Sequence, residues 1–287
     1  MAGGTRGLTT AASGRQPVGT GQTLDAPRPA GPVVAAVVAV LVGVGVLPGA
    51  GASADTRDVD AACGDLTVLP EFVDIGGFAE ATQEAIRCMA AYQITVGFGD
   101  GTFRPGEPVQ RYHMALFLAR VLDYAAAHDA ADLPEVLDDP GFADTADLSG
   151  EAQQAIRLLY TLGITTGTTA TTFSPNAPVN RRDMARFIAR IQAGVLDAPD
   201  GYYLDDLSQV DAFPDVPADD GVFGGAADIY ALAAAGVAGG HADGTFRPFD
   251  AVIRAHMALF VMRHLDENIT HQRLPALADT DHAPPAT

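Results

Sequence analysis

Three arginines that recur at one position of a repeated motif are the residues of this sequence best suited to bind an anion. Each follows the phenylalanine of a Phe-x-Pro triplet by eight residues and precedes x-x-Met-Ala-x-Phe; the three are Arg111, Arg181 and Arg254. A guanidinium group forms strong, often bidentate hydrogen bonds to carboxylates and phosphates. The repeated arginine therefore indicates either a site for an anion or a repeated ion pair within the protein.

These arginines are expected at the first turn of a helix, where a cation needs a partner. Asn180 and Asp183 bracket Arg181 as an N-cap residue and an acid three positions later would. A cation at this end of a helix opposes the helix dipole, which costs roughly 0.3 kcal/mol or more. One candidate partner is an internal carboxylate, such as the aspartate of a Phe-x-Asp turn. The other is an external anion, held together with free helix N–H groups. The sequence leaves both open.

Other chemistry finds little support in the motifs. The first and third repeats contain Asp-Gly-Thr turns, Asp100 to Thr102 and Asp243 to Thr245, which resemble part of a calcium loop but lack its further acidic ligands. No Ser, Cys or His occurs in a catalytic order, and no glycine loop could hold a phosphate. Paired carboxylates at 138–139 and 219–220 fall in linkers. We therefore expect no metal site, no cofactor and no enzymatic activity.

The elements that position the arginines recur with periods of 70 and 73 residues. Each copy has a Phe-x-Asp turn, an Ala-rich helix, a glycine expected at the end of that helix (Gly97, Gly167 or Gly240), a tight turn, and a second helix with a Met/Phe core face. Fixed-period copies imply units that pack on one another. We expect a mainly α fold of three helix-loop-helix repeats at residues 68–125, 138–194 and 209–266.

Charge and the N-terminal segment bound the class of protein. A net charge of −19 and a pI of about 4.4 argue against nucleic-acid binding, because no basic patch could displace counterions from phosphates. Three arginines, an uncharged apolar run and Ala52-Ser53-Ala54 predict a secretory signal peptide at 1–54, with the mature chain beginning near Asp55. An uncleaved membrane anchor is the alternative. No later segment is apolar enough to span a membrane, and 267–287 reads as a polar tail.

The chain contains two cysteines, Cys63 and Cys88. An even number in an exported chain favours one disulfide, which would join the segment before the first repeat to the first helix of that repeat. Two buried free thiols are the alternative.

Taken together, these motifs resemble the S-layer homology family of bacterial surface proteins. The resemblance rests on Phe-x-Asp, the Ala-Ile pair of the first helix, Gly-Ile-Thr-x-Gly, Asp-Gly-Thr-Phe-x-Pro and Val-x-Arg-x-x-Met-Ala, and it covers about residues 68–266. It implies a pseudo-threefold trimer of repeats shaped as a three-pronged spindle with grooves between the prongs. The arginine of the family's Thr-Arg-Ala-Glu motif, which reaches the groove, is matched by the three arginines above, although the Glu is absent from all three copies.

The resemblance also implies a function. Such modules bind a secondary cell-wall polymer, often one bearing pyruvylated sugars whose carboxylate would give the arginines a purpose. We expect the ligand-binding residues to be the three arginines, the three glycines and four turn residues, namely Asp100, Thr102, Asp243 and Thr245. The chain would then be a secreted wall anchor on a bacterial surface. The alternative is a protein–protein adaptor or scaffold of the envelope in which the grooves have degenerated and the arginines pair internally.

Overall fold

The computed structural model describes residues 58–196, 213–217 and 224–277. The predicted signal peptide at 1–54, residues 197–212 and 218–223, and the end of the polar tail lie outside these residues. The signal peptide and its alternative, an uncleaved anchor, therefore stay predictions. Within the described part, no helix is both long enough and apolar enough to cross a membrane.

Each repeat contributes a short first helix and, in every case, a longer second one. The first helices are α2 (Glu80–Ala91), α4 (Gly150–Thr161) and α6 (Ala226–Ala234), and the second helices are α3 (Arg111–Ala127), α5 (Arg181–Gly194) and α7 (Arg254–Thr270). A short helix, α1 (Asp60–Cys63), precedes the first repeat, and a single 3₁₀ turn, η1 (Ala143–Thr145), lies at the start of the second. The described residues form only isolated β-bridges, so the mainly α prediction is confirmed.

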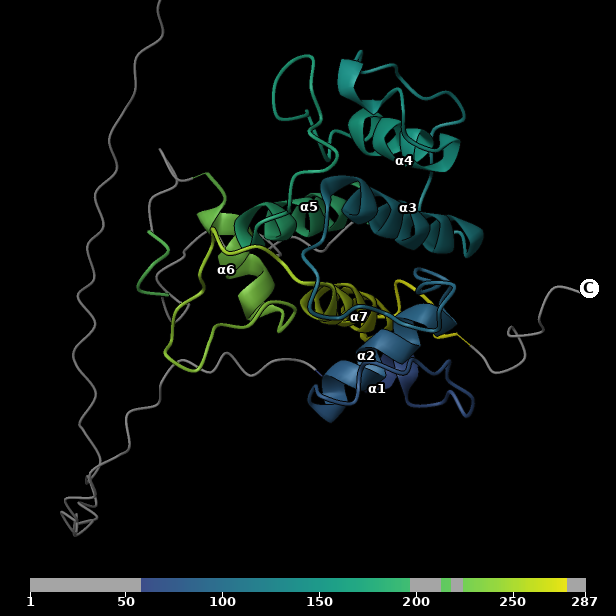
Figure 1. Cartoon of the computed structure of the whole chain (residues 1–287), viewed down its shortest axis with the longest axis vertical. Helices are drawn as coiled ribbons and strands as arrows, with labels where there is room; N and C mark the ends of the chain where they lie inside the picture. The colour runs from purple at the N-terminus through teal and green to yellow at the C-terminus, as the bar shows by residue number, and fades with distance from the viewer. Residues whose placement is uncertain (1–57, 197–212, 218–223, 278–287) are drawn as a thin grey trace, which may run out of the picture. The chain divides into compact units, whose positions relative to one another are not determined.

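The first helix of each repeat packs on the second helix of another repeat. The closest-packed pairs are α4 with α3, α6 with α5, and α2 with α7, and Figure 1 shows these pairs lying beside each other. Each repeat therefore completes the core of its neighbour, and the third repeat returns to the first. A single repeat would leave its apolar face exposed, as the fixed period of the motif led us to expect.

Backbone hydrogen bonds between the repeats close a second cycle, just before the second helices. The Val109 N–H donates to the Val252 carbonyl at 2.8 Å, and the Val252 N–H donates to the Val179 carbonyl at 2.8 Å. The Val179 N–H donates to the Val109 carbonyl at 2.9 Å, which closes the ring. All three valines are buried. Because buried amides need partners, this ring fixes how the three segments meet.

The aspartate of each Phe-x-Asp turn holds the Phe-x-Pro turn of its own repeat. In the first repeat the Asp74 carboxylate accepts the N–H groups of Phe103 and Arg104, each at 2.8 Å. Asp144 and Asp215 do the same in the other repeats. Arg104 has a left-handed backbone with φ of 57°, which is strained for a residue with a side chain. The carboxylate offsets that strain with two charge-assisted hydrogen bonds.

The prediction that Gly97, Gly167 and Gly240 end the first helices is wrong. The helices end six residues earlier, and these glycines instead leave room for the phenylalanine of Phe-x-Asp. A Cβ on Gly167 would lie 2.6 Å from the ring of Phe142, and a Cβ on Gly240 would lie 2.7 Å from the ring of Phe213. Any side chain here would displace that ring from the core.

The two cysteines form a disulfide between α1 and α2, as one of the two sequence readings predicted. Cys63 and Cys88 are both buried, and the bridge closes a loop with a sequence separation of 25. The same region is held by the Tyr92 hydroxyl, which donates to the Ala62 carbonyl at 2.9 Å. The bond therefore ties the segment before the first repeat to the core.

Reducing this disulfide is expected to lower the free energy of unfolding by about 2–4 kcal/mol, because the unfolded chain regains the entropy of an open loop. Denaturant melts with and without reductant measure the change. The Cys63→Ser/Cys88→Ser variant serves as the control, since its melt should not respond to reductant. Equal stability of the oxidised and reduced chains would contradict the expected contribution.

One histidine of α7 is fully buried. His264 of α7 is 1% exposed, and neither ring nitrogen has a hydrogen-bond partner. Matching positions carry Val121 in α3 and Ile191 in α5. Burial, with a smaller effect of nearby Arg273, lowers the His264 pKa to about 4. The imidazole is therefore neutral in the folded protein at neutral pH.

We expect His264→Val to remove part of the acid sensitivity of the fold. Since the unfolded histidine has a pKa near 6.5 and the folded one a pKa near 4, the unfolded state binds the extra proton between these values. Stability is therefore lost as pH falls from 6.5 towards 4, by about 3 kcal/mol in total. Thermal melts of both proteins at pH 7 and pH 5 measure this, with His128→Gln, which alters the exposed histidine that follows α3, as the control. An unchanged pH dependence in His264→Val would contradict it.

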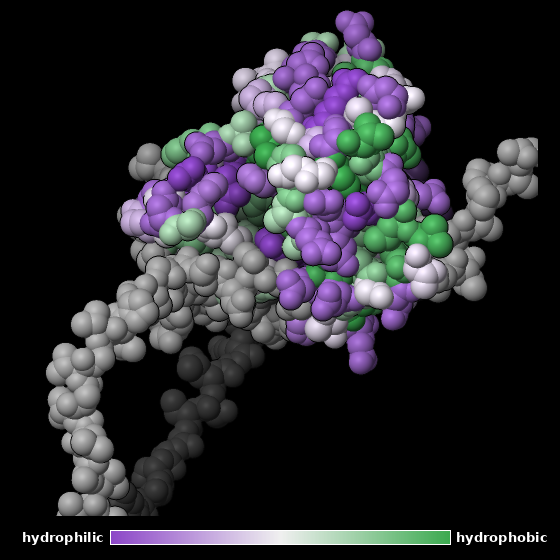
Figure 2. All heavy atoms as spheres, turned by 60° about the horizontal axis from the view of Figure 1, so that its bottom comes forward, coloured by the Kyte–Doolittle hydropathy of each residue, from purple (hydrophilic) through white to green (hydrophobic). Residues whose placement is uncertain are grey.

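Hydrophilic side chains predominate on the face shown in Figure 2, with smaller hydrophobic areas between them. Among the residues that the structure describes, few large hydrophobic residues are well exposed: Val68, Val73, Val96, Val136 and Phe249. The apolar residues of the repeats therefore lie mainly in the core. Candidate binding sites are instead the recesses between the repeats.

Candidate functional site

Each of the three predicted arginines bridges two repeats. Arg111, Arg181 and Arg254 are the first residues of α3, α5 and α7 and are only 5–7% exposed. The Nε–H of each donates to the carbonyl of the Phe-x-Pro phenylalanine in the neighbouring repeat: Arg111 to Phe173 at 2.8 Å, Arg181 to Phe246 at 2.7 Å, and Arg254 to Phe103 at 2.7 Å. Arg181 also donates from Nη2 to the Gly239 carbonyl at 2.7 Å.

The partner of the arginine is therefore internal, but it is a carbonyl rather than a carboxylate. The peptide group that joins Phe173 to Ser174 accepts from Arg111 at its oxygen and donates to Asp144 at its nitrogen. Arginine and aspartate thus act on opposite ends of one peptide, and each charge polarises it in the favourable direction. Both sequence alternatives miss this arrangement, because the carboxylate acts on the arginine only through the peptide.

The N–H groups at the helix starts are not free for an external anion either. The Arg111 amide donates to the Ala177 carbonyl, and the Tyr112 amide to the Pro175 carbonyl, at 3.0 and 3.1 Å. The other two helices have equivalent bonds. An anion at these grooves would therefore meet side chains rather than a helix terminus.

Aromatic rings surround each guanidinium. The Arg111 guanidinium carbon lies 4.7 Å from the Phe173 ring centre and 5.7 Å from that of Phe187, and Arg181 and Arg254 lie in similar surroundings. Such contacts contribute about 0.5–2 kcal/mol. Burial lowers the pKa of all three arginines, that of Arg181 to about 10, so each stays charged at neutral pH.

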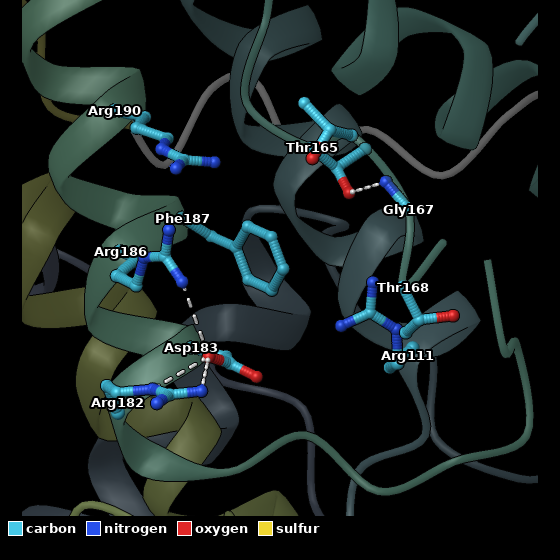
Figure 3. Close-up of a pocket in the computed structure, with 10 residues that line it drawn as sticks. Arg111, Thr165, Gly167, Thr168, Arg182, Asp183, Arg186, Phe187 and Arg190 are labelled. Atoms are coloured by element: carbon cyan, nitrogen blue, oxygen red, sulfur yellow. Dashed lines mark hydrogen bonds and ion pairs between the residues drawn. The ribbon is translucent and has the colours of Figure 1, made fainter. Parts of the chain in front are cut away.

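The recess between repeats 1 and 2, which we name groove 1–2, is lined by four arginines. Its volume is about 310 Å³, and its lining consists of Arg111, Thr165, Thr166, Gly167, Thr168, Arg182, Asp183, Arg186, Phe187 and Arg190. In Figure 3 the α5 arginines lie along one wall, opposite Thr165, Gly167 and Thr168. With a single carboxylate among them, the lining has a formal charge of +3 in a chain of −19.

Asp183 organises the arginines of α5. Its backbone N–H is capped by the Asn180 side chain at 2.8 Å, as the sequence predicted. Its carboxylate lies 3.0 Å from Arg182 Nη2 and 3.9 Å from Arg186 Nη1. Arg190 donates to the Ile164 carbonyl on the other wall at 2.8 Å. The guanidinium groups are therefore held in place around the recess, as an anion-binding site requires.

Groove 2–3, between repeats 2 and 3, has arginines at two of the four positions that carry arginine in groove 1–2, and it also contains two histidines. Its volume is about 260 Å³, and its lining consists of Arg181, Val237, Gly239, Gly240, His241, His256, Leu259, Phe260 and Arg263. His256 occupies the α7 position that Asp183 has in α5, and Leu259 replaces Arg186. This groove is therefore less cationic at neutral pH.

Groove 3–1, between repeats 3 and 1, is partly filled by an aromatic ring. Phe98 packs against two guanidinium groups: the carbon of Arg104 lies 3.8 Å from its ring centre and that of Arg254 lies 5.0 Å away. These three residues line a recess of about 490 Å³, together with the apolar Pro108 and Pro178 and with His113. The three grooves thus differ chemically although their repeats share one motif.

The other predicted site residues are divided between grooves and turns. All three glycines lie against the phenylalanine of their own Phe-x-Asp turn, and Gly167 and Gly240 also line groove 1–2 and groove 2–3. Asp100 accepts from the amide and hydroxyl of Thr102, at 3.1 and 2.5 Å. Asp243 and Thr245 make the same pair of bonds. None of these four turn residues lines the three recesses above, and their assignment to a ligand site stays a prediction.

The arginines that make groove 1–2 distinctive were not among the predicted site residues. Arg182, Arg186 and Arg190 recur at i, i+4 and i+8, which places them on one helical face. This spacing could have predicted a cationic face on that helix from the sequence alone. Among the described residues, no group of three or more His, Cys, Asp or Glu side chains could hold a metal ion.

Comparison with known families supports the resemblance seen in the sequence. The family model for the S-layer homology domain matches residues 71–115, 141–185 and 212–258. Each match runs from the Phe-x-Asp turn into the start of a second helix and so contains one bridging arginine. A search of curated proteins found no match.

Proposed function

The chain carries three tandem S-layer homology domains, and we propose that it is a secreted, non-enzymatic module that anchors itself to the cell wall of a bacterium. Domains of this family are generally wall-binding modules. The ligand in this proposal is an anionic secondary cell-wall polymer, such as one that carries pyruvylated sugars. It binds in the recesses between repeats, foremost in groove 1–2.

The observation that carries this proposal is the charge of groove 1–2. Four of the chain's 17 basic residues line one recess of about 310 Å³ in a protein with a net charge of −19. A polyanion is repelled by the protein as a whole, so attraction must be local and at short range. Guanidinium groups that are already held in place lose little entropy when they bind a carboxylate or phosphate.

In this proposal the three repeats form a pseudo-threefold assembly, with one recess between each pair. Three cyclic sets of contacts support that arrangement: the helix pairs, the valine ring and the arginine-to-carbonyl bonds. Each set starts in one repeat, passes through the next two and returns to the first. The grooves exist because the repeats meet.

An adaptor or scaffold of the envelope is the second candidate, and two observations favour it. The Nε–H of each predicted arginine already donates a hydrogen bond to a carbonyl of the neighbouring repeat, which is a structural role. Groove 3–1 is also partly filled by Phe98. In that case the partner is another envelope protein rather than a glycan.

Binding to isolated cell walls separates the two functions. We expect the mature protein to sediment with walls and to be released by an excess of the soluble wall polysaccharide. The scaffold function predicts retention by envelope proteins and no binding to protein-free walls. Binding to protein but not to protein-free walls would overturn the anchoring proposal.

A further inference from the structure

Groove 2–3 carries imidazoles where groove 1–2 carries an acid and a hydroxyl. His256 takes the place of Asp183, and His241 takes the place of Thr168. The cavity of about 260 Å³ contains Arg181 and Arg263, which take the places of Arg111 and Arg190. Both histidines therefore face a recess that keeps a cation from each of two repeats.

One of these imidazoles has an unused polar atom. His241 Nε2 is buried and has no hydrogen-bond partner. The loop that carries it is fixed, because the His241 backbone N–H donates to the Thr245 carbonyl at 2.7 Å and its carbonyl accepts from the Gly244 amide at 2.8 Å. A buried polar atom without a partner is unfavourable, and a ligand atom in the recess would satisfy it.

The charged groups around the two imidazoles come from three parts of the fold. His256 faces Arg181 of α5 and Arg263 of its own helix, together with His241. His241 faces Arg181 and Arg247, opposed by Asp243 and Asp250 of the same loop region. Burial first, and then these cations, lower the pKa of both histidines. At neutral pH both rings are uncharged, and an entering anion would favour their protonated forms.

We propose that groove 2–3 binds a carboxylate-bearing sugar of the wall polymer together with protons on His241 and His256, so that this groove binds more tightly as the pH falls. The inference rests on the proposed function, because it takes the same anionic polymer as ligand. The lining of groove 1–2 contains no histidine, so we expect its affinity to stay nearly constant over the same pH range. The chain thus combines an anion site whose affinity does not depend on pH, in groove 1–2, with one whose affinity rises in acid, in groove 2–3.

Isotherms for binding of the whole mature chain to isolated cell walls at pH 7.5 and pH 5.5 test this. Each proton taken up on binding can raise affinity by up to tenfold per pH unit, and we expect an increase of about tenfold for the wild type. The His241→Gln/His256→Gln variant should change by less than about twofold. His128→Gln, which alters an exposed histidine away from the grooves, should behave as the wild type. Near-UV circular dichroism at each pH verifies that every variant is folded, and the single His241→Gln and His256→Gln variants replace the double one if it is not.

The possible outcomes separate this inference from the function on which it rests. Titration of the walls themselves would affect all variants equally, so an increase that survives in the double variant overturns the role of the histidines and leaves wall anchoring intact. A wild type that binds equally at both pH values overturns it too. Failure of the wild type to bind walls at any pH overturns the proposed function and this inference together.

Discussion

Replacing Arg181 by glutamine is expected to lower the free energy of unfolding by about 2–4 kcal/mol, the largest loss for any of the bridging arginines. The side chain is 7% exposed and donates to two carbonyls of repeat 3, those of Phe246 and Gly239. A shorter amide cannot reach both, and each buried acceptor left without a donor costs about 1–3 kcal/mol. Arg111 and Arg254, for which a single such bond is described, should lose less. Denaturant melts of the three single variants give the order.

Arg247→Gln is the matched control for this experiment. Its side chain is 45% exposed and pairs with Asp243 at 2.8 Å, so solvent screens the ion pair and its loss should change stability little. Equal and small losses for Arg181→Gln and Arg247→Gln would mean that the bridge between repeats contributes nothing to folding. The result bears on function as well, because a chain whose repeats separate would also lose its grooves.

Replacing Arg186 by glutamine is expected to weaken binding to cell walls by about 10- to 150-fold, with little change in stability. Arg186 lines groove 1–2, is 33% exposed, and has only a long ion pair of 3.9 Å with Asp183. A hydrogen bond to a charged group contributes about 1.5–3 kcal/mol, which corresponds to this range of affinity. Unlike the bridging arginines, Arg186 can therefore report on binding separately from folding. Wall-binding isotherms beside thermal melts measure both effects.

Arg157→Gln provides the control within the same repeat. It removes an arginine from α4 that pairs with Asp139 at 3.1 Å and does not line groove 1–2. If wall binding depended only on the number of positive charges, the two variants would weaken binding equally. That outcome would contradict a site in groove 1–2, whereas a selective effect of Arg186→Gln supports it.

The helices and the starts of the second helices were largely predictable from the sequence, because those features are local. The Met/Phe face of each second helix and the Asn180 cap depend on residues within one or two turns of each other. The disulfide could be proposed from two cysteines and an export signal. The glycines were misread, since a glycine that leaves room for a ring looks the same in sequence as one that ends a helix.

The partners of the arginines could not be predicted, because they lie far away in the chain. Arg111 bonds to a carbonyl 62 residues later, and Arg254 to one 151 residues earlier. The acceptor is a backbone atom that every residue carries, so no side chain marks it. A carboxylate or an external anion was therefore the partner that the sequence led us to expect.

The differences among the grooves also needed the structure. The Asp-Gly-Thr turns were expected to hold ligand-binding residues, but Asp100 and Asp243 accept hydrogen bonds from the threonines of their own turns. Groove character depends instead on residues such as Arg186, Leu259 and Phe98, which face a recess only after two repeats have packed together. We therefore expect Arg111, rather than Arg254, to be the bridging arginine that contributes most to binding.

Co-sedimentation with cell walls before and after removal of the secondary polymer by hydrofluoric acid tests the anchoring function most directly. We predict that the mature protein binds the intact walls and that binding falls at least tenfold on the extracted walls, since peptidoglycan alone lacks the anion that groove 1–2 fits. Arg186→Gln should show the same small residual binding on both preparations. Equal binding of the wild type to intact and extracted walls, or no binding to either, would contradict anchoring through an anionic polymer.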